Sequence, residues 1–224
     1  MALKLLSGGA AQALVGRMKG ARDVQGTFGA VGAMRDKLLA GEACDVLILT
    51  QALIDELTRQ GQVVAGSAAP LGVVKTGVAV KSGEPRPDIS SRDALQAALR
   101  GASAVYFPDP QKATAGIHFM KVLKALGVDE ELRDRMRTFP NGATAMGEMA
   151  QAAARGAIGC TQVTEILHVA GVDLVGLLPK EFELATVYTA AVCTQARSPE
   201  AAREFVQLLA GEQAAGARLE CGFE

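Results

Sequence analysis

The chain alternates short apolar runs with longer segments whose apolar residues recur at helical spacing. "LKLLS" and "CDVLILT" are typical of strands, whereas "QALIDELTRQG" repeats its apolar residues every three or four positions, as a helix does. Strands are predicted at residues 3–7, 23–28, 44–50, 71–83, 103–109, 172–179 and 185–193, with a strand and a turn at 157–167. Helices are predicted at residues 10–20, 30–42, 51–61, 91–101, 114–128, 129–137 and 198–221, with a turn and a helix at 138–156. This alternation predicts an α/β fold in layers.

Several residues mark the ends of the predicted helices. Gly61 stands at a C-cap position, and Ser90 or Ser91 is expected to cap the helix that follows the proline-rich loop. Ser198 is expected to be an N-cap, with Pro199 at the first helical position. These signals support the predicted boundaries of the helices.

Two β runs, at residues 73–81 and 185–193, are longer than one strand of one sheet requires. We expect both to cross between two lobes. The first lobe would then comprise residues 1–77 and 189–224, and the second lobe residues 78–188.

Composition narrows the class of protein. The chain has 224 residues, 49% of them apolar and 21% charged, and a formal net charge of −1. These values are typical of a soluble globular protein and give no electrostatic preference for nucleic acid or acidic membranes. The four cysteines are scattered without a CxxC pair, so neither a metal site nor a cofactor is expected.

The chain shows no apolar run of membrane-spanning length, so no membrane insertion is expected. Its first residues also lack the long apolar region of a signal peptide. We therefore expect a cytoplasmic location if Met1 is native, and a periplasmic one if a signal peptide was removed.

Small residues recur where a predicted strand leads into a predicted helix. The four stretches are "SGGAAQAL", "FGAVGAMRDKL", "KATAGIHF" and "NGATAMGEM". Free backbone N–H groups at such helix starts bind anions, and small side chains let the ligand approach. Tight turns and close packing demand the same small residues, so a purely structural role is the alternative. Together the four stretches favour a crevice for a small anion.

The order of these motifs along nearly the whole chain resembles the type II periplasmic solute-binding proteins, in their molybdate-binding branch. The resemblance runs from "SGGAAQAL" through "FGAVGAMRDKLLAGEACDVLILT" and "YFPDPQKATAGIHFMKVLKALGV" to "VYTAAVC" and "SPEAAREFVQLL". It implies two α/β lobes, each a mixed sheet flanked by helices, joined by two crossing hinge strands. It also implies an anion held between the lobes, hinge closure on binding, and the membrane subunit of an ABC transporter as a partner.

The ligand-binding residues follow partly from this resemblance and partly from the small-residue stretches. The resemblance places Gly9, Ala30 and Val31 where the first lobe's family serines would stand, and Tyr188 at the hinge tyrosine. The full set of predicted ligand residues is Ser7, Gly8, Gly9, Ala10, Gly29, Ala30, Val31, Lys75, Thr114, Ala115, Gly116, Ala143, Thr144, Gln162 and Tyr188.

Two functions from different classes remain open, beside a third, an intracellular anion sensor that passes its closed state to a partner. The leading one is solute binding of a small oxyanion or carboxylate for an ABC-type transporter. The loss of the family hydroxyls disfavours molybdate, because each unmet acceptor of a desolvated anion costs about 1–3 kcal/mol. The alternative is an isomerase of an unsaturated di- or tricarboxylate, since the superfamily also includes aconitate isomerase.

Isomerisation would require an acid and a base, for which His118 and Tyr188 are the candidates. Asp109 is expected to cap a turn. Glu165 is a further candidate acid or base, although an exposed glutamate at a helix start is the favoured interpretation. Thr161 and Thr164, directly after a buried strand, are further candidate contacts, and Lys75 or Thr76 is expected to face the cleft.

Overall fold

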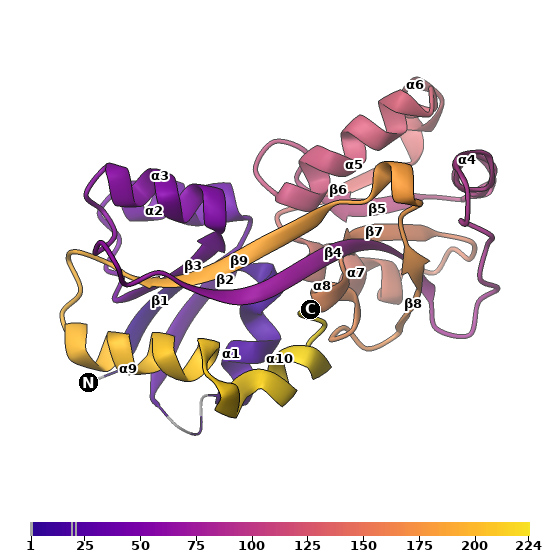
Figure 1. The fold of residues 1–224 in the computed structure, drawn as a ribbon. Helices are drawn as coiled ribbons and strands as arrows, with labels where there is room; N and C mark the ends of the chain where they lie inside the picture. The colour runs from indigo at the N-terminus through magenta and orange to yellow at the C-terminus, as the bar shows by residue number, and fades with distance from the viewer. Residues whose placement is uncertain (1, 19, 21) are drawn as a thin grey trace. The chain divides into compact units, whose positions relative to one another are not determined.

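The computed structural model describes residues 2–18, 20 and 22–224, which divide into two compact units (Figure 1). Unit 1 comprises the chain up to Val74 and again from Thr186, and unit 2 comprises Lys75–Ala185. The chain passes from unit 1 to unit 2 within strand β4 (Ala69–Lys81) and returns within strand β9 (Ala185–Val192). The sequence places the boundaries after residues 77 and 188, inside the same two β runs.

Unit 1 is a sheet of strand order β2-β1-β3-β9 with helices on both faces. Its other elements are β1 (Leu3–Gly8), η1 (Gly9–Ala11), α1 (Gln12–Met18), β2 (Val24–Gly29), α2 (Val31–Leu39), β3 (Val46–Thr50), α3 (Gln51–Arg59), α9 (Pro199–Ala210), η4 (Glu212–Ala214) and α10 (Ala215–Glu220). β1 pairs parallel with β2 and β3, and β9 pairs antiparallel with β3. Figure 1 shows α2 and α3 on one face of this sheet and α1, α9 and α10 on the other. The strands read as apolar runs because helices cover both faces.

Unit 2 is a sheet of strand order β4-β7-β5-β6, with β8 also paired to β4. Its elements besides β4 are α4 (Arg92–Gly101), β5 (Val105–Pro108), α5 (Thr114–Ala125), α6 (Asp129–Leu132), η2 (Arg133–Arg135), β6 (Met136–Phe139), α7 (Gly142–Gln151), β7 (Ile158–Gln162), α8 (Val163–Ile166), β8 (Val172–Leu177) and η3 (Lys180–Phe182). β5 pairs parallel with β6 and β7, whereas β4 pairs antiparallel with β7 and β8.

The core of unit 2 lies on both faces of its sheet. Val78 and Phe107 belong to one buried cluster with α4 and α5, and Ala79 belongs to another with α7. Val78 and Ala79, successive residues of β4, therefore belong to different clusters, because side chains along a strand alternate between the two faces of the sheet. Both faces are thereby removed from water, which gives the sheet of unit 2 its apolar strands.

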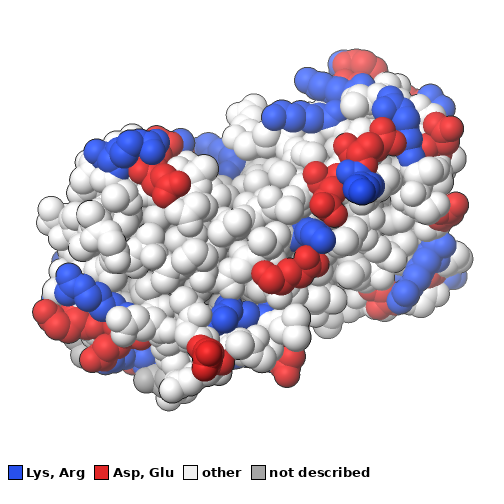
Figure 2. Space-filling view, in the orientation of Figure 1, with Lys and Arg blue, Asp and Glu red and all other residues white. Residues whose placement is uncertain are grey.

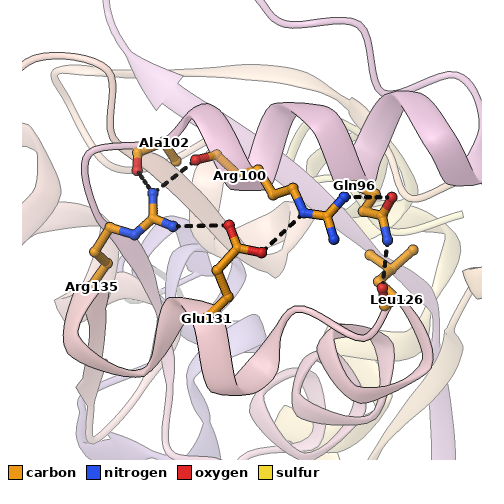
Figure 3. Close-up of polar contacts among 6 residues, drawn as sticks. All are labelled: Gln96, Arg100, Ala102, Leu126, Glu131 and Arg135. Atoms are coloured by element: carbon orange, nitrogen blue, oxygen red, sulfur yellow. Dashed lines mark hydrogen bonds and ion pairs between the residues drawn. The ribbon is translucent and has the colours of Figure 1, made fainter.

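The C-terminal end of α4 is held by an arginine from η2 (Figure 3). Nη1 of Arg135 donates to the carbonyl oxygens of Arg100 and Ala102, both at 2.8 Å. Glu131 pairs with both arginine side chains, at 3.0 Å to Arg100 Nε and 3.6 Å to Arg135 Nη2. Helix carbonyls at a C-terminus lack partners within the helix, so this cation satisfies them and favours the helix dipole.

Four local predictions need correction. β6 lies where a helix was expected to end and a turn to begin. The sequence pattern missed this strand because it lies at the edge of the sheet, where the exposed Arg137 and Thr138 leave no apolar run. A short helix, α8, replaces the turn expected after β7. The side chain of Ser198 makes no cap hydrogen bond, although Pro199 does begin α9. The first predicted helix splits into η1 and α1, and its expected end includes Lys19, outside the described residues.

Each unit gathers helix starts at the carboxyl ends of its parallel strands. In unit 1, β1, β2 and β3 end next to the starts of η1, α2 and α3, and Tyr188 of β9 lies opposite Thr50 in the register. In unit 2, the ends of β5, β6 and β7 precede α5, α7 and α8, and Thr76 of β4 lies opposite Gln162. In open α/β sheets this edge is where ligands bind.

Candidate functional site

The carboxyl edge of unit 1 is built around Gly8, the last residue of β1. A Cβ at Gly8 would lie 2.8 Å from Cγ1 of Val31 and 3.0 Å from Cε1 of Tyr188, so only glycine lets these three residues meet. Ser7 is fully buried, and its hydroxyl donates to the carbonyl oxygen of Gly8 at 2.8 Å. The structure thus brings together Gly8, Val31 and Tyr188, while the Ser7 hydroxyl is used within the strand end.

Three helical segments, η1, α2 and α3, begin at this edge without a side-chain cap. η1 starts after Gly8, and α2 starts after Ala30, and in neither case does a side chain cap the helix. Gly29 precedes Ala30, and a Cβ there would lie 2.8 Å from Cε of Met34. The first backbone N–H groups of α2 therefore carry no side-chain acceptor, which leaves them suited to an anion.

Unit 2 offers a similar start at α5. Ala113 is its N-cap residue, and no side chain caps the helix. Ala115 and Gly116 are buried in the first turn, and a Cβ at Gly116 would lie only 2.2 Å from the carbonyl oxygen of Pro108. Gly116 therefore allows α5 to begin directly against the end of β5. Asp109 accepts from the N–H groups of Gln111 and Lys112 at 2.7 and 3.1 Å, which confirms its predicted role in the turn.

The start of α7 differs, because the protein fills it with its own acceptors. Oδ1 of Asn141 accepts from the N–H of Thr144 at 2.8 Å. The carboxylate of Glu165 accepts from the N–H groups of Gly142 and Ala143. Ala143 and Thr144, both predicted ligand residues, thus already donate within the chain. Asn141, directly before the helix, is an N-cap signal that the sequence contains.

Glu165 is buried, which overturns its expected position as an exposed helix-start residue. It is 7% exposed, and Oγ1 of Thr161 donates to its Oε2 at 2.6 Å. Burial raises the pKa of Glu165, and the hydrogen bonds from Thr161 and the backbone only partly offset this effect. A Cβ at Gly142 would lie 1.9 Å from Thr161 Oγ1 and 2.1 Å from Glu165 Oε2, so the carboxyl group occupies space that only glycine leaves.

Buried hydroxyl groups surround the same end of β7. Thr76 and Thr164 are 1% and 2% exposed, and their Oγ1 atoms make no hydrogen bond within the described part of the chain. Gln162, also buried, is the last residue of β7 and lies opposite Thr76. Lys75, a predicted ligand residue, instead pairs with Glu183 at 3.7 Å. Of the two residues expected to face a ligand, Thr76 is therefore the buried one with an unsatisfied hydroxyl.

Comparison with known protein families shows to which family this chain, with its two carboxyl edges, belongs. The family described as bacterial extracellular solute-binding protein matches residues 11–224, nearly the whole chain. The chain belongs to this family. An aconitate isomerase from a Pseudomonas species is 31% identical to it over 193 residues, which is 86% of this chain and 71% of that protein.

Solved structures confirm the fold of this solute-binding protein. A periplasmic molybdate-binding protein from Azotobacter vinelandii matches with a TM-score of 0.82 at 19% identity, over 99% of this chain and 98% of that one. A sulfate-binding protein from Mycobacterium tuberculosis matches with a TM-score of 0.74 at 17% identity, over 100% and 86% of the two chains. These matches confirm the predicted type II periplasmic-binding-protein fold and the molybdate-binding-like resemblance.

The two histidines of the solute-binding protein contact backbone carbonyl groups. Nε2 of His118, in the second turn of α5, lies 2.8 Å from the carbonyl oxygen of Phe182 in η3. Nδ1 of His168 lies 3.2 Å from the carbonyl oxygen of Thr164. His118 therefore links α5 to η3, and a catalytic role for it stays a prediction.

Neither a metal cluster nor a membrane-crossing helix is found among the described residues. No group of three or more His, Cys, Asp or Glu side chains there could hold a metal ion. No described helix has both the length and the apolar character that a membrane crossing requires.

Proposed function

We propose that this solute-binding protein binds a small organic anion whose carboxylates accept hydrogen bonds from helix starts in both units. Membership of the solute-binding family and the anion-binding proteins that share its fold support a small anion as the solute. The anion is proposed to lie between the units, with hinge closure on binding.

The observation that carries this proposal is the contrast between the helix starts. α2 and α5 begin without a side-chain cap, whereas α7 is closed by Asn141 and Glu165. Among the described helices, α3, α8 and α9 also begin without a side-chain cap, so a missing cap alone does not mark a ligand site. α2 and α5 combine an uncapped start with small residues at the carboxyl end of a parallel strand, and these two starts are proposed to receive acceptors from the ligand.

A carboxylate fits better than a tetrahedral oxyanion for two reasons. Gly9, Ala30 and Val31 offer no hydroxyl group, and each unmet acceptor of a buried oxyanion costs about 1–3 kcal/mol. The relative with 31% identity is named for aconitate, an unsaturated tricarboxylate. Both observations favour a di- or tricarboxylate over molybdate or sulfate.

Surface charge does not supply the attraction. Figure 2 shows acidic and basic side chains next to one another on the face that it draws, with broad uncharged areas between them. Charged side chains of the protein also pair with one another, among them Arg100 with Glu131 and Lys37 with Glu42. The proposal therefore assigns anion recognition to local backbone N–H groups and not to a one-signed surface.

The proposed setting is the periplasm, where the protein would deliver its solute to the membrane subunit of an ABC-type transporter. The extracellular character of the family supports this location. Growth of a deletion strain on di- and tricarboxylates as sole carbon source tests it, together with cell fractionation.

A pair of matched variants tests the binding site itself. Thr114→Asp places a carboxylate in the first turn of α5, where it takes the ligand's position and favours the helix dipole. Thr144→Asp makes the same change in α7, whose N–H groups already have acceptors. Calorimetry with citrate, cis-aconitate and trans-aconitate is expected to show at least a tenfold loss of affinity for Thr114→Asp and little change for Thr144→Asp. Equal affinity in both variants would contradict the assignment of α5.

A second function, isomerisation of an unsaturated di- or tricarboxylate, is favoured by the identity to aconitate isomerase. In such a reaction a base removes a proton next to a carboxylate, the double bond shifts by one position, and an acid returns a proton at the far carbon. Glu165, a buried acid with a raised pKa, fits a proton carrier and joins His118 and Tyr188 as a candidate.

NMR of cis- and trans-aconitate with the protein in D₂O separates the two functions. Migration of the double bond with deuterium incorporation would show an enzyme, and binding without migration would show a transport protein. If migration occurs, Glu165→Gln, His118→Ala and Tyr188→Phe are each compared for turnover and for binding, because a proton carrier lowers turnover more than affinity.

A further inference from the structure

Unit 2 contains a cavity that lies away from its carboxyl edge. The cavity has a volume of about 530 Å³ and is bounded by α4, by the loop that follows β4 and by the residues that lead into β7. Ile158, the first residue of β7, lines it, whereas Gln162 at the other end of that strand belongs to the candidate edge. Four residue steps along a strand span about 13 Å, so the cavity is separate from the proposed anion site.

The walls of this cavity are mostly aliphatic. The described residues that line it include no aromatic side chain, and most of them are small or apolar. The alanines and prolines among them are Ala97, Ala98, Ala102, Ala157, Pro85 and Pro87. The volume lies within the range of about 300–1,000 Å³ that is typical of small-molecule pockets. Walls of this kind fit an alkyl chain and offer no ring on which an aromatic group could stack.

Glu84 gives the cavity one fixed negative charge. Its side chain is only 7% exposed, and its Oε2 accepts from the N–H of Gly156 at 2.8 Å. Gly156 has a φ of +77°, which favours glycine, and its carbonyl oxygen accepts from the N–H of Ser103 at 2.9 Å. The backbone therefore holds the carboxylate in position before any ligand arrives.

The second oxygen of this carboxylate is only weakly engaged. Oε1 of Glu84 faces Nε of Arg155 at 3.7 Å, which is too far for a hydrogen bond. The side chain of Arg155 is 79% exposed, and so exposed a partner contributes little to an ion pair. Among the described residues that line the cavity, Glu84 is the only acid and Arg155 the only base. The cavity thus presents a buried acceptor for which a better donor can compete.

We propose that this cavity binds a small aliphatic amine in its protonated form. The ammonium group donates to Oε1 of Glu84, and the alkyl chain lies along the alanine and proline walls. An ammonium group only donates and a carboxylate only accepts, so the two match, and their hydrogen bond is strengthened by charge. A divalent metal ion would require further oxygen ligands, whereas Glu84 is the only carboxylate among the described lining residues. The exposed side chain of Arg155 is free to turn towards water when the amine enters.

A series of matched probes tests the proposal by NMR on the isotope-labelled full-length chain. n-Pentylamine carries both the charge and the alkyl chain, n-pentanol carries the chain alone, and pentanoate carries the opposite charge. We expect n-pentylamine to bind in the millimolar range and to shift the backbone amide signals of Ala98, Gly156 and Ile158. We expect n-pentanol to bind about tenfold more weakly and pentanoate to leave these signals unchanged.

Variants separate the charge from the walls. Glu84→Gln keeps an acceptor for the N–H of Gly156 and removes the charge, so n-pentylamine should bind about tenfold more weakly and n-pentanol as before. Glu130→Gln removes an exposed carboxylate outside the cavity and should change neither affinity. Arg155→Ala removes the competing cation, so n-pentylamine should bind at least as tightly as to the wild type.

Ala97→Leu gives a second test if Glu84→Gln fails to fold. Ala97 is an exposed residue of α4 that lines the cavity, so a longer side chain there should weaken both n-pentylamine and n-pentanol. Equal affinity for the two probes, unchanged affinity in Glu84→Gln and Ala97→Leu, or no shift of the cavity signals would each overturn the proposal. Binding of a lysine-containing peptide without binding of n-pentylamine would also overturn it, because the cavity would then serve a protein partner. Citrate and aconitate do not enter these measurements, so their result is independent of the proposed function.

Discussion

At the scale of single residues, two buried carboxyl groups, Asp45 and Glu165, have different roles. Asp45 accepts from three backbone N–H groups, including that of Arg197 at 2.7 Å, and so connects the approach to α9 with the start of β1. Glu165 instead occupies the start of α7 at the candidate edge, with its pKa raised by burial. The first is a structural anchor, while the second places a titratable group beside the proposed ligand site.

The raised pKa of Glu165 predicts a pH dependence of stability. The folded protein keeps the Glu165 carboxyl group protonated at pH values where the unfolded chain has released the proton. The contribution of this group to stability is therefore fully present below its ordinary pKa and is lost as the pH rises through the raised pKa of the folded state. Over that window the free energy of unfolding is expected to fall by up to about 1.4 kcal/mol per pH unit for this one proton. Urea unfolding at a series of pH values should show the fall in the wild type and not in Glu165→Gln. If the free energy of unfolding showed the same dependence on pH in both proteins, the prediction would be contradicted.

Thr76 carries a second prediction at this scale. Its buried hydroxyl has no hydrogen-bond partner among the described residues, so Thr76→Val removes an unsatisfied group and is expected to keep or slightly raise the stability of the free protein. If the hydroxyl contacts the anion, affinity falls about tenfold or more, because a hydrogen bond to a charged group contributes about 1.5–3 kcal/mol.

Thr189→Val is the control for Thr76→Val. The Thr189 hydroxyl is buried and donates to Oε1 of Gln51 at 2.5 Å. Its loss should lower the melting temperature and leave anion affinity unchanged. Unchanged affinity in Thr76→Val, with a lower melting temperature, would show that the Thr76 hydroxyl is structural.

At the scale of elements, helix starts with the same small-residue signature have different environments. α5 begins against the backbone of β5 at Gly116 and has no side-chain cap, whereas α7 begins at Gly142 with a carboxyl group in place. The glycines therefore serve two purposes. One lets a helix approach a strand, and the other leaves room for Glu165.

Two glycines of α7 form a matched pair of substitutions. A Cβ at Gly142 would enter the space of Thr161 and Glu165, so Gly142→Ala is expected to lower the free energy of unfolding by about 1–3 kcal/mol. Apart from the backbone of its own helix, a Cβ at Gly147 would meet no atom of the described residues within 4 Å, so Gly147→Ala is expected to raise the free energy of unfolding by about 0.5–1 kcal/mol through helix propensity. Chemical denaturation measures both. A stabilising effect of Gly142→Ala would contradict the close placement of Glu165.

At the scale of the whole molecule, the chain crosses twice between units of similar size, in β4 and β9. An anion that takes hydrogen bonds from both units, as proposed, would stabilise both at once. At a concentration about 100 times its dissociation constant it should add about 2.7 kcal/mol to the free energy of unfolding, or about 5–10 °C to the melting temperature.

A thermal-shift series with molybdate, sulfate, phosphate, citrate, cis-aconitate and trans-aconitate measures this effect. We expect the carboxylates to shift the melting temperature and the tetrahedral oxyanions to shift it little. A shift with molybdate alone would contradict the preference for carboxylates.

The order of most elements, the two long β runs and the family could all be predicted from the amino-acid sequence. Each of these depends on local patterns, such as the apolar run of β3 or the helical spacing of α3, which set backbone conformation within a few residues. The sequence also located the small-residue helix starts at Gly8, Ala30 and Ala113, because a tight approach restricts side-chain size at that position itself.

Only the tertiary structure decided which of those starts is already filled. Glu165 reaches Gly142 from another element, and nothing in the letters "TEIL" distinguishes a buried carboxyl group from an exposed one. The inward position of Thr76 and the exposed edge strand β6 were likewise set by strand pairing. The physical reason is the same in each case. A side chain's partners come from segments far away in the sequence, and their identity depends on which strands and helices the packed core brings together.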